Sequence, residues 1–109
     1  MAQFDVHRNR GALRDAIPFV VIVQSGQFDR YRRRVVVPLV RRAELPASSS
    51  AVGARLNPGF VVNGIQVVLH PLDMVSVALD QLGEKVGSLA ESGLVIGDAL
   101  DELFTQSWG

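Results

Sequence analysis

The chain has 109 residues and a mass of 11.8 kDa, the size of one ordinary domain, so we expect a single domain over residues 1–109. Apolar residues make up 48% of the chain and charged residues 20%, which is typical of a folded globular protein and excludes a disordered one. The absence of cysteine from the sequence excludes a disulfide framework, a thiolate zinc site and catalysis by cysteine.

The net charge is zero, but the charges are unevenly distributed along the chain. Residues 1–55 contain ten arginines and four acidic residues, a net charge of +6, whereas residues 56–109 contain one lysine and seven acidic residues, a net charge of −6. A dipolar chain of this kind can steer charged partners. No apolar run approaches the roughly 18 residues of a membrane span, and residues 1–10 lack an apolar signal core, so we expect a cytoplasmic protein without membrane contact.

The first half of the chain predicts three β-strands. Gln3–Val6 alternates polar and apolar residues, and the polar segment Asn9–Asp15 that follows is typical of a loop. Phe19–Val23 is continuously apolar, which indicates a strand that is buried on both faces or lies at an interface. The third strand is expected over Arg34–Val40. It contains Pro38, which has no backbone donor and should therefore lie at an edge or a bulge.

The second half begins with a loop and a β-hairpin. Ala47–Pro58 is rich in serine, glycine and proline and predicts a surface loop. Asn63 and Gly64 separate two apolar stretches, and both residue types tolerate the positive φ that a two-residue type I′ turn requires. We therefore expect a hairpin over Phe60–Leu69.

The chain ends in a helical pattern. Asp73–Val77 predicts a short strand or turn, and Gly83 marks the start of a polar connection. Ser92 is a candidate N-cap, and Gly97 costs about 1 kcal/mol relative to alanine, which close approach to the sheet would explain. One helix face carries the apolar residues Ile96, Ala99, Leu100, Leu103 and Phe104. The predicted fold class is therefore mostly β (α+β), closed by a C-terminal helix.

The sequence shows no constellation for metal or cofactor chemistry. His7 and His70 lie in different predicted strands without partner residues at ligand spacing, so we expect neither metal nor cofactor. Asp98, Asp101 and Glu102 could form a carboxylate pair on the helix, but a solvated helix face explains them more simply. The phosphate-binding and nucleophile-elbow glycine motifs are absent from the sequence.

Two further features leave alternatives open. Arg30–Arg34 contains four arginines around Tyr31, and this cluster suits a phosphate or a base, an acidic partner, or the solvated start of a strand. Trp108 is the penultimate residue. A large indole there either folds back onto the body or binds a partner, since tryptophan is enriched at interface hot spots.

Several ordered segments resemble the CcdB family of bacterial toxins. The opening Met-Ala-Gln-Phe-Asp-Val resembles the family's Met-Gln-Phe-x-Val, and Val-Ile-Val-Gln-Ser resembles its strand end Val-x-Val-Gln-Ser, with Asp29 at the family spacing. Arg-Arg-Val-Val-Val-Pro-Leu is similar to the family's Arg-Arg-x-Val-x-Pro-Leu, and Asp-Met-Val-Ser-Val to its Asp-Met-Ala-Ser-Val. The matching segments are Met1–Val6, Val21–Ser25, Arg33–Leu39, Arg55–Pro58, Asp73–Val77 and Leu82–Val86.

The resemblance implies an SH3-like barrel of antiparallel strands with a small second sheet and a C-terminal helix. It implies the toxin of a type II toxin–antitoxin system, with a role in plasmid maintenance. Family toxins are homodimers that bind the A subunit of DNA gyrase and trap the cleaved-DNA complex, and a disordered antitoxin, CcdA, removes them. Such a toxin makes or breaks no bond itself, so the resemblance implies that the chain is not an enzyme and does not bind specific nucleic-acid sequences alone.

The resemblance also implies site residues. The family contacts gyrase mainly through a C-terminal Phe-Trp-Gly-Ile. In this chain Phe104 matches the Phe, while Trp108 and Gly109 match by type three residues further on. The remaining gyrase contacts are expected at Gln27, Phe28 and Asp101. The positive charge of residues 1–55 predicts that the antitoxin binds this half of the chain. The apolar run Phe19–Val23 predicts a dimer interface near the end of that run. The residues are Arg8, Arg10 and Arg14 for the antitoxin, and Val21, Val23 and Ser25 for the dimer.

Two other functions compete with gyrase poisoning. The MazF/Kid toxins share the barrel and cleave RNA, and His7, Arg10 or an arginine from residues 30–34 could supply the base and the cations that cleavage requires. A non-toxic relative that keeps only the fold and antitoxin binding is the other alternative.

Overall fold

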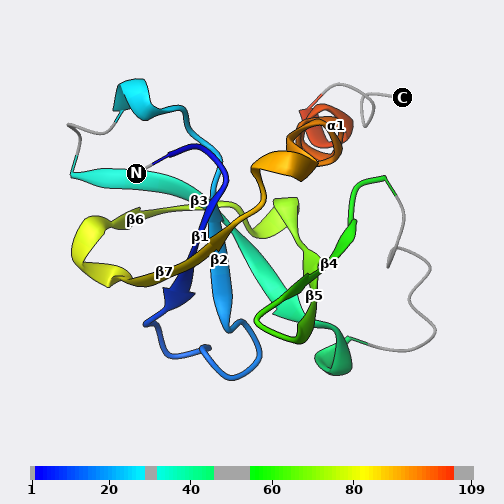
Figure 1. Cartoon of the computed structure of the whole chain (residues 1–109), viewed down its shortest axis with the longest axis horizontal. Coiled ribbons are helices and arrows are strands. Elements are labelled where there is room, and N and C mark those ends of the chain that lie inside the picture. Colours follow the sequence, from blue (N-terminus) through cyan, green and yellow to red (C-terminus); the bar gives the residue numbers. More distant parts are fainter. Residues whose placement is uncertain (1, 29–31, 46–54, 105–109) are drawn as a thin grey trace.

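In the described part of the chain, seven antiparallel strands form one hydrogen-bonded sheet, and one α-helix follows them (Figure 1). The computed structural model describes residues 2–28, 32–45 and 55–104. The strand order is β4-β5-β3-β2-β1-β7, and β6 pairs with β3 outside this path. The elements are β1 (Asp5–Asn9), β2 (Phe19–Ile22), β3 (Arg33–Arg41), β4 (Gly59–Val62), β5 (Ile65–Leu69), β6 (Val75–Ala78), β7 (Leu82–Ser88) and α1 (Gly93–Phe104).

The expected fold class is confirmed, and β3 is its central strand. One edge of β3 pairs with β2, while the other edge is divided between β6, which reaches Val36, and β5, which begins opposite Leu39. Pro38 lies between these two partners. Its carbonyl accepts the His70 N–H at 3.1 Å, so its nitrogen faces the same divided edge, where no ladder donor is needed. The proline is thus accommodated inside a central strand rather than at an edge or a bulge.

The sheet has apolar side chains on both faces. Val6, Val21 and Leu39 face the larger cluster, which includes Ile96 and Ala99 of α1. Val20 and Val36 face a smaller cluster on the opposite side, which Leu82 and the half-buried Val77 complete. This two-sided burial explains why Phe19–Val23 is continuously apolar, since all four residues of β2 are buried.

The hairpin predicted at Asn63 and Gly64 is confirmed. β4 and β5 pair in register up to Val62 and Ile65, so the connection has two residues. Both connecting residues have positive φ, 50° for Asn63 and 76° for Gly64, as a type I′ turn requires. Local turn chemistry alone therefore fixes this part of the fold.

The first strand begins later than its alternation predicts. The Asp5 N–H donates to the Ala2 carbonyl at 3.1 Å, and Phe4 has φ of 70°, so residues 2–5 form a turn instead of a strand. β1 runs from Asp5 to Asn9. The short strand expected near Asp73–Val77 is confirmed as β6, which follows the 3₁₀ turn η3 (Pro71–Asp73).

The polar connection predicted from Gly83 is wrong, because Gly83 lies inside β7. This strand pairs with β1, with two irregularities in register. A Cβ on Gly83 would lie 2.8 Å from the Arg8 Cβ and 2.9 Å from the Arg8 carbonyl oxygen, so only glycine allows this approach of the strands.

The C-terminal helix is confirmed as α1, which begins directly after Ser92. Ile96 and Ala99 are fully buried, and Leu100 packs against the same cluster. A Cβ on Gly97 would meet no atom within 4 Å, so close approach to the sheet does not explain this glycine. Within the described residues no helix is long and apolar enough to cross a membrane.

The two glycines give opposite predictions for stability. Gly97→Ala should raise the free energy of unfolding by about 0.5–1 kcal/mol, because alanine favours the helix and its methyl group meets open space. Gly83→Ala should lower it by about 1–3 kcal/mol through overpacking against Arg8. Urea denaturation of both variants measures the two changes. A loss of stability in Gly97→Ala would contradict this account of α1.

Candidate functional site

The loop between β1 and β2 is held in place by Asn9, the last residue of β1. The Asn9 Nδ2 donates to the Ile17 carbonyl at 2.9 Å, and its Oδ1 accepts the Gly11 N–H at 2.9 Å. From β3, the Arg41 backbone N–H donates to the Ala16 carbonyl at 2.8 Å. This connection therefore has defined geometry although it has little regular structure.

Three arginines surround the end of β1. Arg8, Arg10 and Arg14 line one surface groove together with Asn9 and residues 83–84, and all three arginines are exposed. The Arg8 Nε donates to Glu84 Oε1 at 2.7 Å, and its guanidinium carbon lies 5.8 Å from the centre of the Phe19 ring. We call this surface the arginine groove. It brings together the three residues for which the sequence predicted antitoxin binding.

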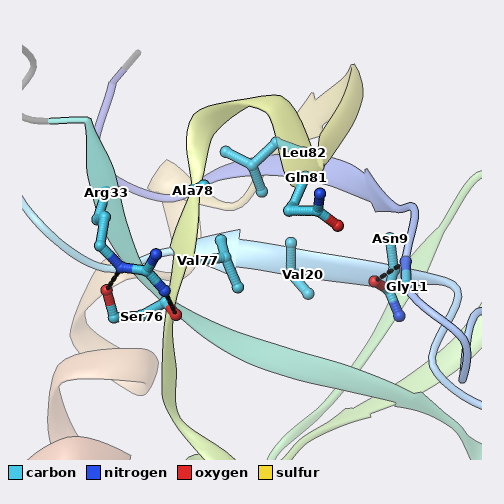
Figure 2. A pocket seen from close by; sticks show the side chains of 9 residues that line it. All are labelled: Asn9, Gly11, Val20, Arg33, Ser76, Val77, Ala78, Gln81 and Leu82. Atoms are coloured by element: carbon cyan, nitrogen blue, oxygen red, sulfur yellow. Dashed lines mark hydrogen bonds between the residues drawn. The ribbon is translucent and has the colours of Figure 1, made fainter.

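A pocket of about 210 Å³ adjoins the groove at Asn9, which lines both (Figure 2). Val77 and Val20 lie between Arg33 at one end and Asn9 at the other. The Arg33 guanidinium donates from Nε to the Ser76 Oγ at 2.9 Å and from Nη2 to the Ser76 carbonyl at 2.7 Å. We call this cavity the Asn9 pocket. Its lining residues are Asn9, Gly11, Val20, Arg33, Ser76, Val77, Ala78, Gln81 and Leu82.

Sequence reasoning missed the Asn9 pocket. Asn9 carried a turn signal, because a short polar side chain at a strand end often bonds the local backbone. Gln81 carried no signal, because its position depends on the 3₁₀ turn η4 (Leu79–Gln81) that brings it over the second face of the sheet.

The outer face of α1 is apolar and acidic. Leu94 is 88% exposed and Phe104 is 58% exposed, and the exposed carboxylates of Asp98 and Asp101 lie on the same helix. Arg55 approaches this helix, with its guanidinium 3.8 Å from the carboxylates of Asp98 and Glu102. These carboxylates thus line the outside of α1 and interact with a cation from another part of the chain.

The other predicted gyrase residues fall outside α1. Gln27 is exposed and Phe28 ends the 3₁₀ turn η1 (Gly26–Phe28), a separate element after β2. Trp108 and Gly109 lie outside the described residues, as do Arg30, Tyr31 and most of the predicted loop Ala47–Pro58.

The residues predicted for a dimer interface differ in burial, and the interface stays a prediction. Val21 is fully buried between β1 and β3. Val23 and Ser25 follow β2 and are half-buried.

The two histidines have different partners. His7 is buried, and its Nδ1 lies 2.9 Å from the Gly83 carbonyl oxygen, while the His70 Nδ1 lies 3.0 Å from the Asp73 carboxylate. In the part of the chain that the structure describes, three metal-ligating side chains do not gather anywhere. His7 is therefore enclosed by β1 and β7 rather than presented beside the exposed Arg10.

Solved structures with a similar fold include one described as a toxin and two described as endoribonucleases. The Mycobacterium tuberculosis toxin MazF-mt6 superposes with a TM-score of 0.70 at 14% identity, covering 92% of this chain and 95% of that one. An endoribonuclease in complex with its cognate antitoxin, from a mycobacterial species, gives a TM-score of 0.73 at 14% identity over 100% and 99% of the two chains. A further mycobacterial endoribonuclease gives 0.66 at 15% identity over 95% and 90%.

These neighbours correct the prediction that the chain is not an enzyme. That prediction rested on the resemblance and on the lack of a catalytic motif in the sequence. Two chains that share this fold along nearly their whole length are described as endoribonucleases, so the fold is one that can carry an enzymatic activity. The exclusion of enzymatic activity is therefore withdrawn.

The family of the chain follows from comparison of its sequence with known families. No curated protein sequence is significantly similar to the chain. A sequence profile of the CcdB family, described as CcdB protein, matches residues 3–106, which is nearly the whole chain. The solved structures agree with this family in fold, and the profile match carries the assignment. The chain belongs to the CcdB family.

Proposed function

We propose that this toxin poisons DNA gyrase by binding its A subunit and trapping the cleaved-DNA complex. Membership of the CcdB family over residues 3–106 is the observation that carries the proposal. The proposed contact surface consists of the outer face of α1, with Phe104 and Asp101, and the chain end that bears Trp108 and Gly109. Gln27 and Phe28 on η1 would add to it, and the toxin would act as a homodimer.

The outer face of α1 has the chemistry of a partner surface. Leu94 and Phe104 are large apolar side chains that a monomer gains nothing by exposing, and they lie beside the carboxylates of Asp98 and Asp101. A partner that covers this face would bury apolar area and would need basic groups to pair with the acids. Trp108 follows this helix by four residues in the sequence and would add an indole to the same contact.

Trp108→Ala should weaken binding to the gyrase A subunit by roughly 30- to 1,000-fold, the range expected for a hot spot of 2–4 kcal/mol. Titration calorimetry with the purified subunit measures the change. Leu13→Ala is the matched control, because Leu13 is a large side chain that is 65% exposed in the β1–β2 loop, away from α1. Equal losses in the two variants would remove Trp108 from the proposed contact.

The target is tested in cells. Induced expression should arrest growth, and altered residues in the dimer interface of the gyrase A subunit should restore it. A chain that does not arrest growth would be a non-toxic relative that keeps the fold. Arrest that altered gyrase does not relieve would assign the toxicity to another target.

The antitoxin is proposed to be an acidic, largely disordered segment that binds the arginine groove. The groove presents Arg8, Arg10 and Arg14 with Glu84 as its one acidic residue. Charge complementarity of this kind raises association rates, and salt screens it. The rate of association should therefore fall steeply when salt is raised to about 0.5 M, as stopped-flow fluorescence can measure. A rate that does not change with salt would exclude electrostatic steering.

RNA cleavage is the second candidate function. The observation that favours it is the fold shared with proteins described as endoribonucleases, together with the exposed arginine groove. Incubation of the purified chain with single-stranded RNA in the presence of a chelator tests it directly. Cleavage that Arg10→Gln abolishes would support this activity, and intact RNA would leave gyrase poisoning as the candidate.

A further inference from the structure

We propose that the arginine groove and the adjoining Asn9 pocket together bind a short single-stranded nucleic acid, with its phosphates against the arginines and one base in the pocket. The proposal goes beyond gyrase poisoning and does not depend on whether the chain cleaves the strand that it binds. The three arginines of the groove and the two cavities that meet at Asn9 carry it.

The arginine groove suits a phosphate backbone. Arg10 and Arg14 are exposed, and a guanidinium fork can bind a phosphate through two parallel hydrogen bonds. Glu84 is the one acid among the groove residues, and its carboxylate accepts the Arg8 Nε–H at 2.7 Å. Arg8 neutralises Glu84, so Arg10 and Arg14 leave the groove with a net positive charge toward an approaching nucleic acid.

The Asn9 pocket suits a flat ring with a polar edge. Val20, Val77 and Leu82 provide apolar surface on which a base can lie (Figure 2). Gln81 is exposed at the pocket, and a side-chain amide offers the donor and the acceptor that pair with a base edge. Its volume of about 210 Å³ is far larger than one water molecule needs and leaves room for a ring system.

The two cavities lie side by side, as the phosphate and the base of one nucleotide do. The groove would hold the phosphate and the pocket would hold the base. Asn9 lines both cavities, and neighbouring residues of β7 line one each, Leu82 the pocket and Gly83 the groove. The loop bearing Arg10 and Arg14 is held by both hydrogen bonds of the Asn9 amide, so little ordering is needed on binding. An acidic peptide would satisfy the arginines, but it would leave the Gln81 amide without a matching edge.

The test is fluorescence anisotropy with the purified full chain and labelled oligomers of about eight nucleotides. The probes are a 2′-O-methyl RNA, a DNA of the same sequence, an abasic DNA backbone and a polyglutamate peptide. The variants are Arg10→Gln in the groove, Gln81→Leu in the pocket and Arg42→Gln as a charge-matched control. Arg42 is exposed on the 3₁₀ turn η2 (Arg42–Glu44) and lines neither cavity.

Each variant has its own expected result. Arg10→Gln should weaken all nucleic-acid probes alike and reduce the dependence of log affinity on log salt by about 1, and Arg42→Gln should leave both unchanged. Gln81→Leu should lower the preference for base-bearing over abasic DNA by at least about 5-fold, with little effect on the abasic probe. The difference in affinity between the RNA probe and the DNA probe shows which of the two nucleic acids the surface prefers.

Two results would overturn the proposal. They are no binding of any nucleic-acid probe and equal binding of abasic and base-bearing DNA. Binding of polyglutamate without binding of any nucleic-acid probe would leave the groove to the proposed acidic antitoxin alone. These results are independent of gyrase, because the proposed gyrase contacts lie on α1, on η1 and at the chain end.

Discussion

The division of one edge of β3 is the constraint on which the rest of the fold depends. β3 pairs with β2 along one edge, and its other edge pairs first with β6 and then with β5, with Pro38 at the change of partner. The proline has no N–H to offer at that point, so neither strand loses a ladder bond. The sheet consequently extends in two directions from β3 and buries apolar side chains on both of its faces.

This arrangement separates two surfaces of opposite chemistry on one small chain. The arginine groove lies at the carboxyl end of β1, and α1 lies at the other end of the molecule in the view of Figure 1. The arginine groove is basic, and Asn9 holds the loop that carries two of its arginines. The outer face of α1 is apolar and acidic. The surface proposed for gyrase is therefore separate from the groove proposed for an antitoxin or a nucleic acid.

Local sequence signals predicted the hairpin and the helix, because each depends on neighbouring residues. Asn63 and Gly64 define the turn by their φ angles, and the apolar spacing of Ile96 and Ala99 defines the buried face of α1. β7 was missed because its support is distant in sequence, namely the close approach of Gly83 to Arg8. The three arginines for which charge predicted antitoxin binding lie together in one groove, and their role stays a prediction. The Asn9 pocket forms only where η4 and β1 meet, which no local sequence pattern indicates.

The proposed activity of this CcdB-family chain is to trap gyrase on cleaved DNA. The most direct measurement is the amount of linear DNA released by protein denaturant from a mixture of gyrase, supercoiled plasmid, ATP and the purified chain. The account predicts that linear DNA accumulates with increasing toxin and disappears when gyrase is omitted. Plasmid that stays uncleaved at toxin concentrations that saturate binding to the gyrase A subunit would contradict it.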